Sequence, residues 1–228
     1  MLTSILVVFD LDGTLIDSRA DLAAATNATL HTYGQPPLPE DQVTSFVGEG
    51  ARVLVSRAMA AAGLGDHLVD EALVRFLDLY NTKLLNKTRL YDGVAELITW
   101  AQTVGVTMGV ITNKPQAPTD RLLHALELAP FFHWVIGGDT ELPRKPDPTS
   151  LLWMMEEAGF EPQRTLFVGD SPIDADTARG AGTHFCLAAY GFGQQHGPTA
   201  LGDGEFRANT VADIRTAIDA VRGAGGGA

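Results

Sequence analysis

The residues of this chain best suited to chemistry are two aspartates separated by one residue, Asp10 and Asp12. They follow the apolar run 5–9, which is typical of a strand buried on both faces. Two carboxylates this close repel each other, so the pair predicts a bound divalent cation, one protonated acid, or both. Gly13 allows the backbone to turn sharply and approach a ligand. The structural alternative is a β-turn at Asp12-Gly13 that Asp10 caps.

Three further groups of polar residues stand at or near the ends of short apolar runs. Thr112 and Asn113 offer a hydroxyl, an amide and backbone N–H groups, and Lys145 offers a cation in a turn stiffened by prolines. Asp170 and Asp174 add two more carboxylates where a strand pattern gives way to a helix pattern. Each group also has a structural interpretation, as a helix cap for Thr112 or Asp170 and as a solvated loop charge for Lys145.

The elements that must position these residues follow from hydrophobic periodicity. After residue 90, short apolar runs alternate with helix patterns, which predicts right-handed crossovers and a parallel sheet. The predicted strands are 5–9, 106–111, 134–136, 165–168 and 184–188, and the predicted helices among them are 94–104, 115–128, 148–158, 173–179 and 210–221. The loop 191–209 has no clear pattern, and we expect the glycine-rich end 223–228 to be disordered.

The segment 15–86 differs, because we expect it to be helical throughout and to contain no strand. Its clearest helix, 66–86, has apolar residues three and four positions apart. The predicted fold is therefore α/β: a Rossmann-like parallel sheet core with helices on both faces and an inserted all-helical cap. The expected domains are a core formed by residues 1–14 and 87–228 and a cap formed by residues 15–86.

This arrangement brings the candidate residues together. Parallel strands end at one edge of their sheet, where ligands bind in open α/β folds. We therefore expect Asp10, Thr112, Lys145 and Asp170 at one edge, which four independent structural accidents would rarely produce. Carboxylates suit Mg²⁺, which also takes waters and a substrate phosphate, while a lysine and a hydroxyl suit phosphate oxygens. One carboxylate can attack phosphorus, and the acid two residues later can protonate the leaving oxygen.

Four ordered motifs of the chain resemble those of the haloacid dehalogenase superfamily, and the likeness covers nearly the whole chain. The motifs are Asp10-Leu11-Asp12-Gly13-Thr14-Leu15, Ile111-Thr112-Asn113, Lys145-Pro146 and Gly169-Asp170-Ser171-Pro172-Ile173-Asp174. The helical segment after the first motif resembles the small helical cap of this superfamily.

The resemblance implies a role for each motif residue. Asp10 becomes the aspartyl phosphate, and Asp12 protonates the leaving alcohol and then activates water. Mg²⁺ is implied as the cofactor, with Asp10, the backbone carbonyl of Asp12 and Asp170 as ligands and Asp174 binding directly or through water. Other residues serve the phosphoryl group: Thr112 and the Asn113 amide hold it, Lys145 neutralises it and orients Asp10, and Gly13 and Thr14 form and support the first loop.

Two features of the resemblance concern the substrate. Dehalogenases of this fold lack an acid at the position of Asp12, so its presence favours phosphoryl chemistry. The stretch 46–54 resembles the cap loop of bacterial phosphoglycolate phosphatases, which makes Gly48, Gly50 and Arg52 candidate substrate-binding residues. Residues 189–193 resemble a second segment of those enzymes. The expected reaction is Mg²⁺-dependent hydrolysis of a small phosphomonoester, with 2-phosphoglycolate the leading candidate; a β-phosphoglucomutase-like phosphosugar mutase, or a phosphatase for another ester, is the alternative.

Composition restricts the possible partners. The chain has 228 residues, of which 45% are hydrophobic and 19% charged, as in globular proteins. Its net charge of −12 disfavours nucleic acid, whose binding needs a basic stripe. We expect neither a membrane span nor a signal peptide, because the apolar runs are too short and the N-terminus has no basic region. The single cysteine, Cys186, favours a reducing compartment, so the predicted protein is cytoplasmic, a monomer or homodimer.

Overall fold

The fold is built around the strand that precedes the first aspartate pair. The computed structural model describes residues 4–193 and 199–224. In it, β1 (Leu6–Phe9) lies inside a six-stranded parallel sheet with the order β5-β4-β1-β6-β7-β8. The other strands are β4 (Thr107–Ile111), β5 (Trp134–Ile136), β6 (Thr165–Gly169), β7 (His184–Ala188) and β8 (Phe206–Ala208). Phe9 is level with Val110 of β4 and Val168 of β6, so these three strands end side by side.

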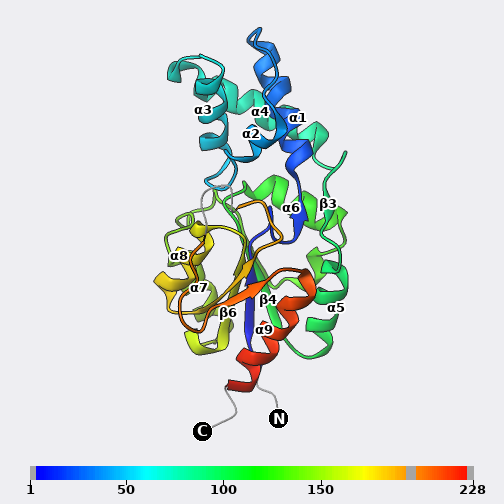
Figure 1. Ribbon diagram of the computed structural model, residues 1–228, viewed down its shortest axis with the longest axis vertical. Helices are drawn as coiled ribbons and strands as arrows, with labels where there is room; N and C mark the ends of the chain where they lie inside the picture. The colour runs from blue at the N-terminus through cyan, green and yellow to red at the C-terminus, as the bar shows by residue number, and fades with distance from the viewer. Residues whose placement is uncertain (1–3, 194–198, 225–228) are drawn as a thin grey trace.

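Helices cover both faces of the sheet, as the sequence predicts (Figure 1). Successive side chains of a strand point to opposite faces, and β1 shows this alternation. Val7 and Phe9 pack in the cluster that α5, α6 and α9 cover, whereas Leu6 and Val8 pack in the cluster that α7 and α8 cover. These helices are α5 (Val94–Thr103), α6 (Gln116–Ala125), α7 (Thr149–Ala158), α8 (Pro172–Ala181) and α9 (Val211–Ala224).

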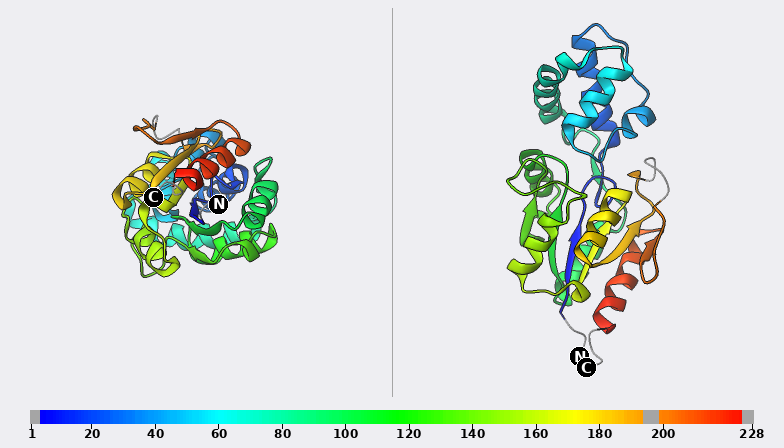
Figure 2. Two further views of the ribbon diagram at one scale, coloured as in Figure 1. Left: turned by 90° about the horizontal axis from the view of Figure 1, so that it is seen from below. Right: turned by 90° about the vertical axis from the view of Figure 1, so that its left-hand side faces the viewer.

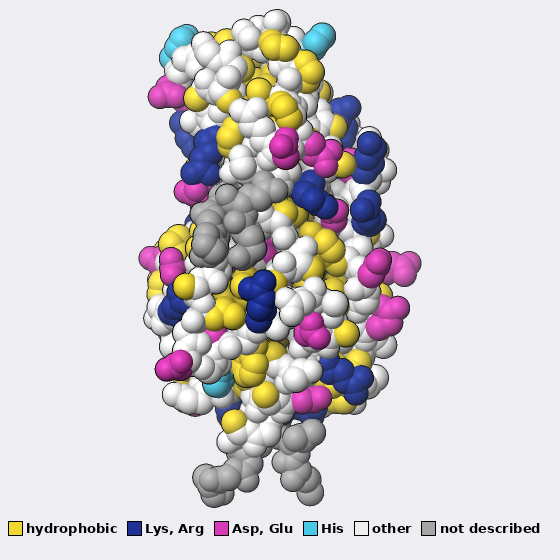
Figure 3. Space-filling model, in the orientation of Figure 1, with side chains coloured by type: hydrophobic (Ala, Val, Ile, Leu, Met, Phe, Trp, Pro, Cys, Tyr) yellow, Lys and Arg dark blue, Asp and Glu magenta, His cyan; other side chains and the backbone are white. Residues whose placement is uncertain are grey.

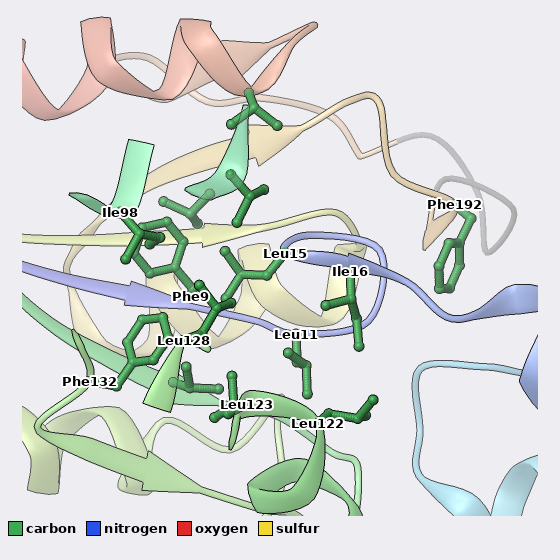
Figure 4. Packing of buried hydrophobic residues seen from close by; sticks show 14 of the residues in the cluster. Phe9, Leu11, Leu15, Ile16, Ile98, Leu122, Leu123, Leu128, Phe132 and Phe192 are labelled. Carbon is green, nitrogen blue, oxygen red and sulfur yellow. The ribbon is translucent and has the colours of Figure 1, made fainter. Parts of the chain in front are cut away.

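Figure 4 shows part of the first of these clusters, where the ring of Phe9 meets Phe132 edge to face, with centroids 6.2 Å apart. Phe9 is fully buried. Burying one such side chain stabilises a fold by about 1.5–3 kcal/mol, so this packing fixes the strand that carries Asp10.

Four helices form a separate layer beyond the carboxyl edge of the sheet (Figure 2). They are α1 (Arg19–Thr32), α2 (Glu40–Thr44), α3 (Ala51–Ala61) and α4 (Val69–Lys83). Two chain connections join this layer to the sheet. They are tied together by Asp21, whose Oδ2 accepts hydrogen bonds from the backbone N–H groups of Lys87 and Thr88 at 2.8 and 2.7 Å and from the Thr88 hydroxyl at 2.8 Å.

The helical character of the insertion and the α/β class are confirmed, but three details of the prediction are wrong. Residues 15–86 do contain a strand, because β2 (Ile16–Asp17) pairs antiparallel with β3 (Arg89–Leu90). The loop 191–209 contains β8, the sixth parallel strand, whose half-exposed edge position gives little hydrophobic pattern. The helix predicted over 66–86 starts as the 3₁₀ turn Asp66–Leu68 and ends at Lys83.

The expected disorder at 223–228 falls largely on residues 225–228, outside the described part of the chain; Gly223 and Ala224 belong to α9.

Charged side chains of both signs lie on the surface (Figure 3). On the face in Figure 3, acidic and basic side chains are interspersed, and the basic ones do not gather into one stripe. Within residues 4–193 and 199–224, no helix combines the length and apolar character needed to cross a bilayer.

Candidate active site

Asp10 and Lys145 form the centre of the site. Asp10 directly follows β1, and its backbone N–H donates to the Val168 carbonyl at 2.9 Å, which continues the sheet ladder by one residue. Lys145 reaches this point from the segment between β5 and α7 and follows no strand directly. Its Nζ donates to Asp10 Oδ1 and to Asp174 Oδ1, each at 2.6 Å. All three side chains are buried, so the lysine compensates two carboxylates that water does not solvate.

Asp170 completes a cluster of three carboxylates with Asp10 and Asp174. One oxygen from each lies within 4.8 Å of the others, and all three residues are buried. Burial raises the pKa of Asp10 to about 6, with the charge of Asp174 adding to the rise and Lys145 opposing it. Burial is also the main cause that raises the pKa of Asp170, and the charges of Asp174 and Asp10 raise it further. One lysine therefore does not neutralise the cluster, and this surplus of buried carboxylate oxygens fits a divalent cation.

Local structure fixes each of the two later carboxylates. Asp174 Oδ2 accepts from the backbone N–H and the hydroxyl of Ser171, at 3.0 and 2.6 Å, in a capping box that starts α8. Its other oxygen accepts from Lys145, so Asp174 both caps the helix and positions the lysine. Asp170 Oδ2 accepts from the backbone N–H of Gly193 at 2.7 Å.

The first loop passes very close to Asp170 at Gly13. Gly13 has a φ of +88°, and a Cβ there would lie 1.8 Å from Asp170 Oδ2. Only glycine can occupy this position without displacing the carboxylate. Thr14 is buried behind the loop; its carbonyl accepts from the Tyr190 hydroxyl at 2.8 Å, and its Oγ1 has no partner among the described residues.

Asp12 lines one cavity together with the three clustered carboxylates, but its side chain contacts other residues than theirs do. Lys114 Nζ donates to both of its carboxylate oxygens, at 3.1 and 2.9 Å, and the Ser18 hydroxyl donates to Oδ1 at 2.5 Å. Lys114 also donates to the hydroxyl of Tyr80 from α4, at 2.7 Å. Sequence reasoning missed Lys114, Ser18 and Tyr80. The available signal for Lys114 was its position directly after Thr112-Asn113.

Thr112 and Asn113 follow β4 and are buried, as expected for residues at this edge. The Asn113 side-chain NH₂ group donates to the carbonyls of Gly48 and Lys145, at 2.9 and 3.0 Å. Its two N–H donors therefore hold the loop at Gly48 and the loop at Lys145.

A single cavity contains most of these groups. Core loops and the cap both line it, with Asp10, Asp12, Thr112, Asn113, Lys114, Lys145, Asp170 and Asp174 from the core side and Leu22, Val47, Gly48, Gly50, Leu54, Phe76, Leu77 and Tyr80 from the cap side. Charged groups therefore meet apolar walls, the usual composition of a small-molecule site.

A family model for haloacid dehalogenase-like hydrolases matches residues 7–188, most of the chain. The chain belongs to the haloacid dehalogenase-like hydrolase family. The phosphoglycolate phosphatase of Pseudomonas putida is 42% identical over 217 residues, which cover 93% of this chain and 78% of that protein. The phosphoglycolate phosphatase of Rhodospirillum rubrum is 42% identical over 195 residues, covering 83% of this chain and 81% of that protein. A solved structure described as a predicted phosphoglycolate phosphatase from Haemophilus somnus matches with a TM-score of 0.85 at 30% identity, covering 93% of this chain and 97% of that one.

Membership of the haloacid dehalogenase-like family confirms the resemblance deduced from the four motifs. The cap residues divide into two groups. Gly48 and Gly50 line the cavity, whereas Arg52 does not. The Arg52 side chain is half exposed and pairs with Asp70 at the start of α4, an arrangement that solvated charges on neighbouring helices commonly adopt.

Proposed function

We propose that this protein hydrolyses 2-phosphoglycolate to glycolate and phosphate, with Mg²⁺ as cofactor and an aspartyl phosphate as intermediate. The observation that carries the proposal is the position of Asp10, buried at the end of the central strand, within 2.6 Å of the Lys145 ammonium and beside two further carboxylates. Family membership and relatives named phosphoglycolate phosphatase, 42% identical over most of the chain, support the reaction and the substrate.

In the proposed reaction Asp10 attacks phosphorus and the alcohol leaves. Lys145 holds Asp10 in orientation and balances the charge of the phosphoryl oxygens. The Thr112 hydroxyl and the backbone N–H group of Asn113 donate to those oxygens, while Gly13 and Thr14 form and support the first loop, whose own N–H groups donate to the carbonyls of Leu11 and Ile16.

The carboxylate cluster would hold Mg²⁺ through Asp10, Asp170 and the backbone carbonyl of Asp12, with Asp174 directly or through water. When bound, Mg²⁺ supplies charge neutralisation for the phosphoryl oxygens. The chain itself supplies the oxygens and keeps them in place, since Gly193 anchors Asp170 and Ser171 anchors Asp174.

Asp12 has the acid–base role. It donates a proton to the leaving oxygen in the first step and takes one from the attacking water in the second. Ser18 and Lys114 fix the position of its carboxylate, so the group does not have to be ordered during the reaction.

We propose the expected domain division, with residues 1–14 and 87–228 as core and 15–86 as cap. The cap would close the site over a small substrate, with Gly48 and Gly50 bringing backbone rather than side chains to the cavity. The contact of Arg52 with Asp70 gives no support to its predicted substrate role. A cytoplasmic location and a monomeric or homodimeric state stay predictions from the sequence.

A screen of small phosphomonoesters, with phosphate release measured in the presence and absence of Mg²⁺, tests the proposal. We expect 2-phosphoglycolate to have the highest kcat/KM and the activity to require Mg²⁺. A second assay, isomerisation of a sugar phosphate with an activating bisphosphate present, tests the mutase alternative. Isomerisation without net phosphate release would refute the hydrolase proposal.

A further inference from the structure

Lys114 is a buried cation whose role in the proposed reaction is to position Asp12. It is 7% exposed, and its ammonium group lies between Asp12 of the core and Tyr80 of the cap. Burying a lysine is costly unless its charge is compensated, and a single carboxylate could be positioned by hydroxyl groups at far lower cost. Its three N–H donors serve the two Asp12 oxygens and the Tyr80 hydroxyl, so an anionic group of the substrate would take the place of one of the two Asp12 oxygens.

The charges around the cavity indicate which ligand. Among the described residues that line it, the cations are Lys145 and Lys114. Lys145 is engaged at the phosphoryl end of the site, between Asp10 and Asp174. A substrate with a second negative group, besides its phosphate, would have Lys114 as its cationic partner.

The position of Asp12 indicates where this second group of the substrate would lie in the cavity. In the proposed reaction Asp12 contacts the bridging oxygen of the ester. In a 2-phosphooxy carboxylate, the carboxyl carbon is two bonds from that oxygen. Because Lys114 Nζ is 2.9 Å from Asp12 Oδ2, a carboxylate placed two bonds from the bridging oxygen comes within reach of the same ammonium group.

The surroundings of Lys114 strengthen an ion pair at this point. Leu22, Phe76 and Leu77 line the cap side of the cavity and limit access of water, which increases electrostatic attraction. Tyr80 accepts a hydrogen bond from Lys114 and still has its own O–H to donate. The core thus offers an ammonium group and the cap a hydroxyl to the same carboxylate.

We propose that Lys114, together with the Tyr80 hydroxyl, binds the carboxylate of the substrate and determines specificity for 2-phosphooxy carboxylates. This inference rests on the proposed function. It also gives cap closure a chemical role, because the carboxylate finds both donors only when α4 lies against the loop after β4.

The test compares 2-phosphoglycolate with its neutral isostere 2-phosphoglycolamide, using kcat/KM for each. The quantity of interest is kcat/KM for 2-phosphoglycolate divided by kcat/KM for the amide. A general loss of catalysis or of folded protein cancels in this ratio. In Lys114→Met we expect the ratio to fall by about 10- to 100-fold, the usual effect of losing a charge-assisted hydrogen bond. Lys114→Arg should recover part of the ratio, because the positive charge is restored.

Two further variants complete the design. Tyr80→Phe should lower the ratio by about 2- to 10-fold, as expected for a neutral hydrogen bond, and it serves if Lys114→Met does not fold. Lys87→Met is the matched control, because this exposed lysine lies outside the cavity, and it should leave the ratio unchanged.

Circular dichroism would establish that each variant is folded. An unchanged ratio in folded Lys114→Met, or in Tyr80→Phe where the lysine variant does not fold, would overturn the specificity role while leaving the proposed function intact. Failure of the wild-type protein to hydrolyse 2-phosphoglycolate, while it hydrolyses other phosphomonoesters, would overturn the choice of substrate and with it this inference.

Discussion

Replacing Asp10 by Asn should inactivate the protein and at the same time stabilise its metal-free form. The substitution keeps the shape of the side chain but removes its charge and most of its nucleophilicity, so hydrolysis should fall by several orders of magnitude. Stability should rise because Asp10 is 7% exposed and shares a small volume with Asp170 and Asp174.

The size of the stabilisation follows from the pKa of Asp10. Burial raises it from 3.8 to about 6, after the opposing effect of Lys145. A difference of about 2 in pKa corresponds to about 3 kcal/mol of unfolding free energy at neutral pH. The folded protein holds this proton more tightly than the unfolded chain. The contribution of Asp10 to stability is therefore largest below about pH 4 and is lost as the pH rises through about 6.

Urea unfolding of both proteins in the presence of a chelator, at pH 7 and at pH 4, measures the effect. We expect Asp10→Asn to be more stable by up to about 3 kcal/mol at pH 7 and nearly equal to the wild type at pH 4. Asp78→Asn is the matched control, because Asp78 is exposed on α4 and lies outside the cavity. It should change the unfolding free energy by less than about 0.5 kcal/mol at either pH.

A metal-free Asp10→Asn protein that is less stable than the wild type at pH 7 would refute this reasoning. It would mean that the attraction between Asp10 and Lys145 exceeds the cost of burying the carboxylate, and that the cluster needs no cation to balance it.

Three further predictions concern the metal, the acid and the cap. Chelation should abolish phosphate release, and Mg²⁺ should restore it, whereas Ca²⁺ should not, because Ca²⁺ takes more ligands at longer distances. Asp170→Ala should raise the Mg²⁺ concentration that activity requires. A chelator-resistant enzyme would contradict the metal assignment. Asp12→Asn should slow formation of the aspartyl phosphate from 2-phosphoglycolate by about 10²–10⁴-fold but slow it far less from p-nitrophenyl phosphate, whose leaving group needs no proton; equal losses in single-turnover experiments would make Asp12 structural. Gly50→Val should lower kcat/KM by about 10-fold or more, since Gly50 has a φ of +92° and a Cβ there would lie 3.1 Å from the Asn113 carbonyl. Gly63→Val, at a φ of +74° with open space around it, carries the backbone strain alone and should retain wild-type kinetics.

The core of the site could be predicted because its residues stand at the ends of strands. Asp10, Thr112 and Asp170 each directly follow a buried apolar run, and parallel strands bring such positions to one edge. Lys145 follows no strand directly, so only its motif indicated its place; its contacts with Asp10 and Asp174 depend on a path through the loop that local sequence does not specify.

The short strands β2 and β3 could not be predicted for a related reason. Each is two residues long, too short for an alternating pattern, and their pairing joins residues more than 70 positions apart. The sixth strand, β8, lies at the sheet edge and has one buried residue, Ala208, which gives a weak hydrophobic signal.

Arg52 and Lys114 illustrate the same limit of local sequence patterns. Arg52 belongs to a stretch that resembles a substrate-binding loop, yet it lies in the first turn of α3 and pairs with Asp70 of α4. The sequence around Lys114 does not indicate that its side chain is buried, and a lysine in a loop is ordinarily solvated. Its burial depends on Asp12 and Tyr80, which are 102 and 34 residues away in the chain. Long-range charge pairing decides both cases, and a single sequence does not reveal it.

The loop after β4 therefore joins substrate chemistry to cap position. Asn113 donates to the carbonyl of Gly48, and Lys114 donates to the Tyr80 hydroxyl, so consecutive residues of one core loop contact two separate parts of the cap. The same two residues face the cavity. A displacement of the cap would remove a partner from each, at the place where phosphate and carboxylate are proposed to bind. In the proposed mechanism, cap closure and substrate recognition thus depend on the same hydrogen bonds, and both the core and the cap contribute polar groups to the site.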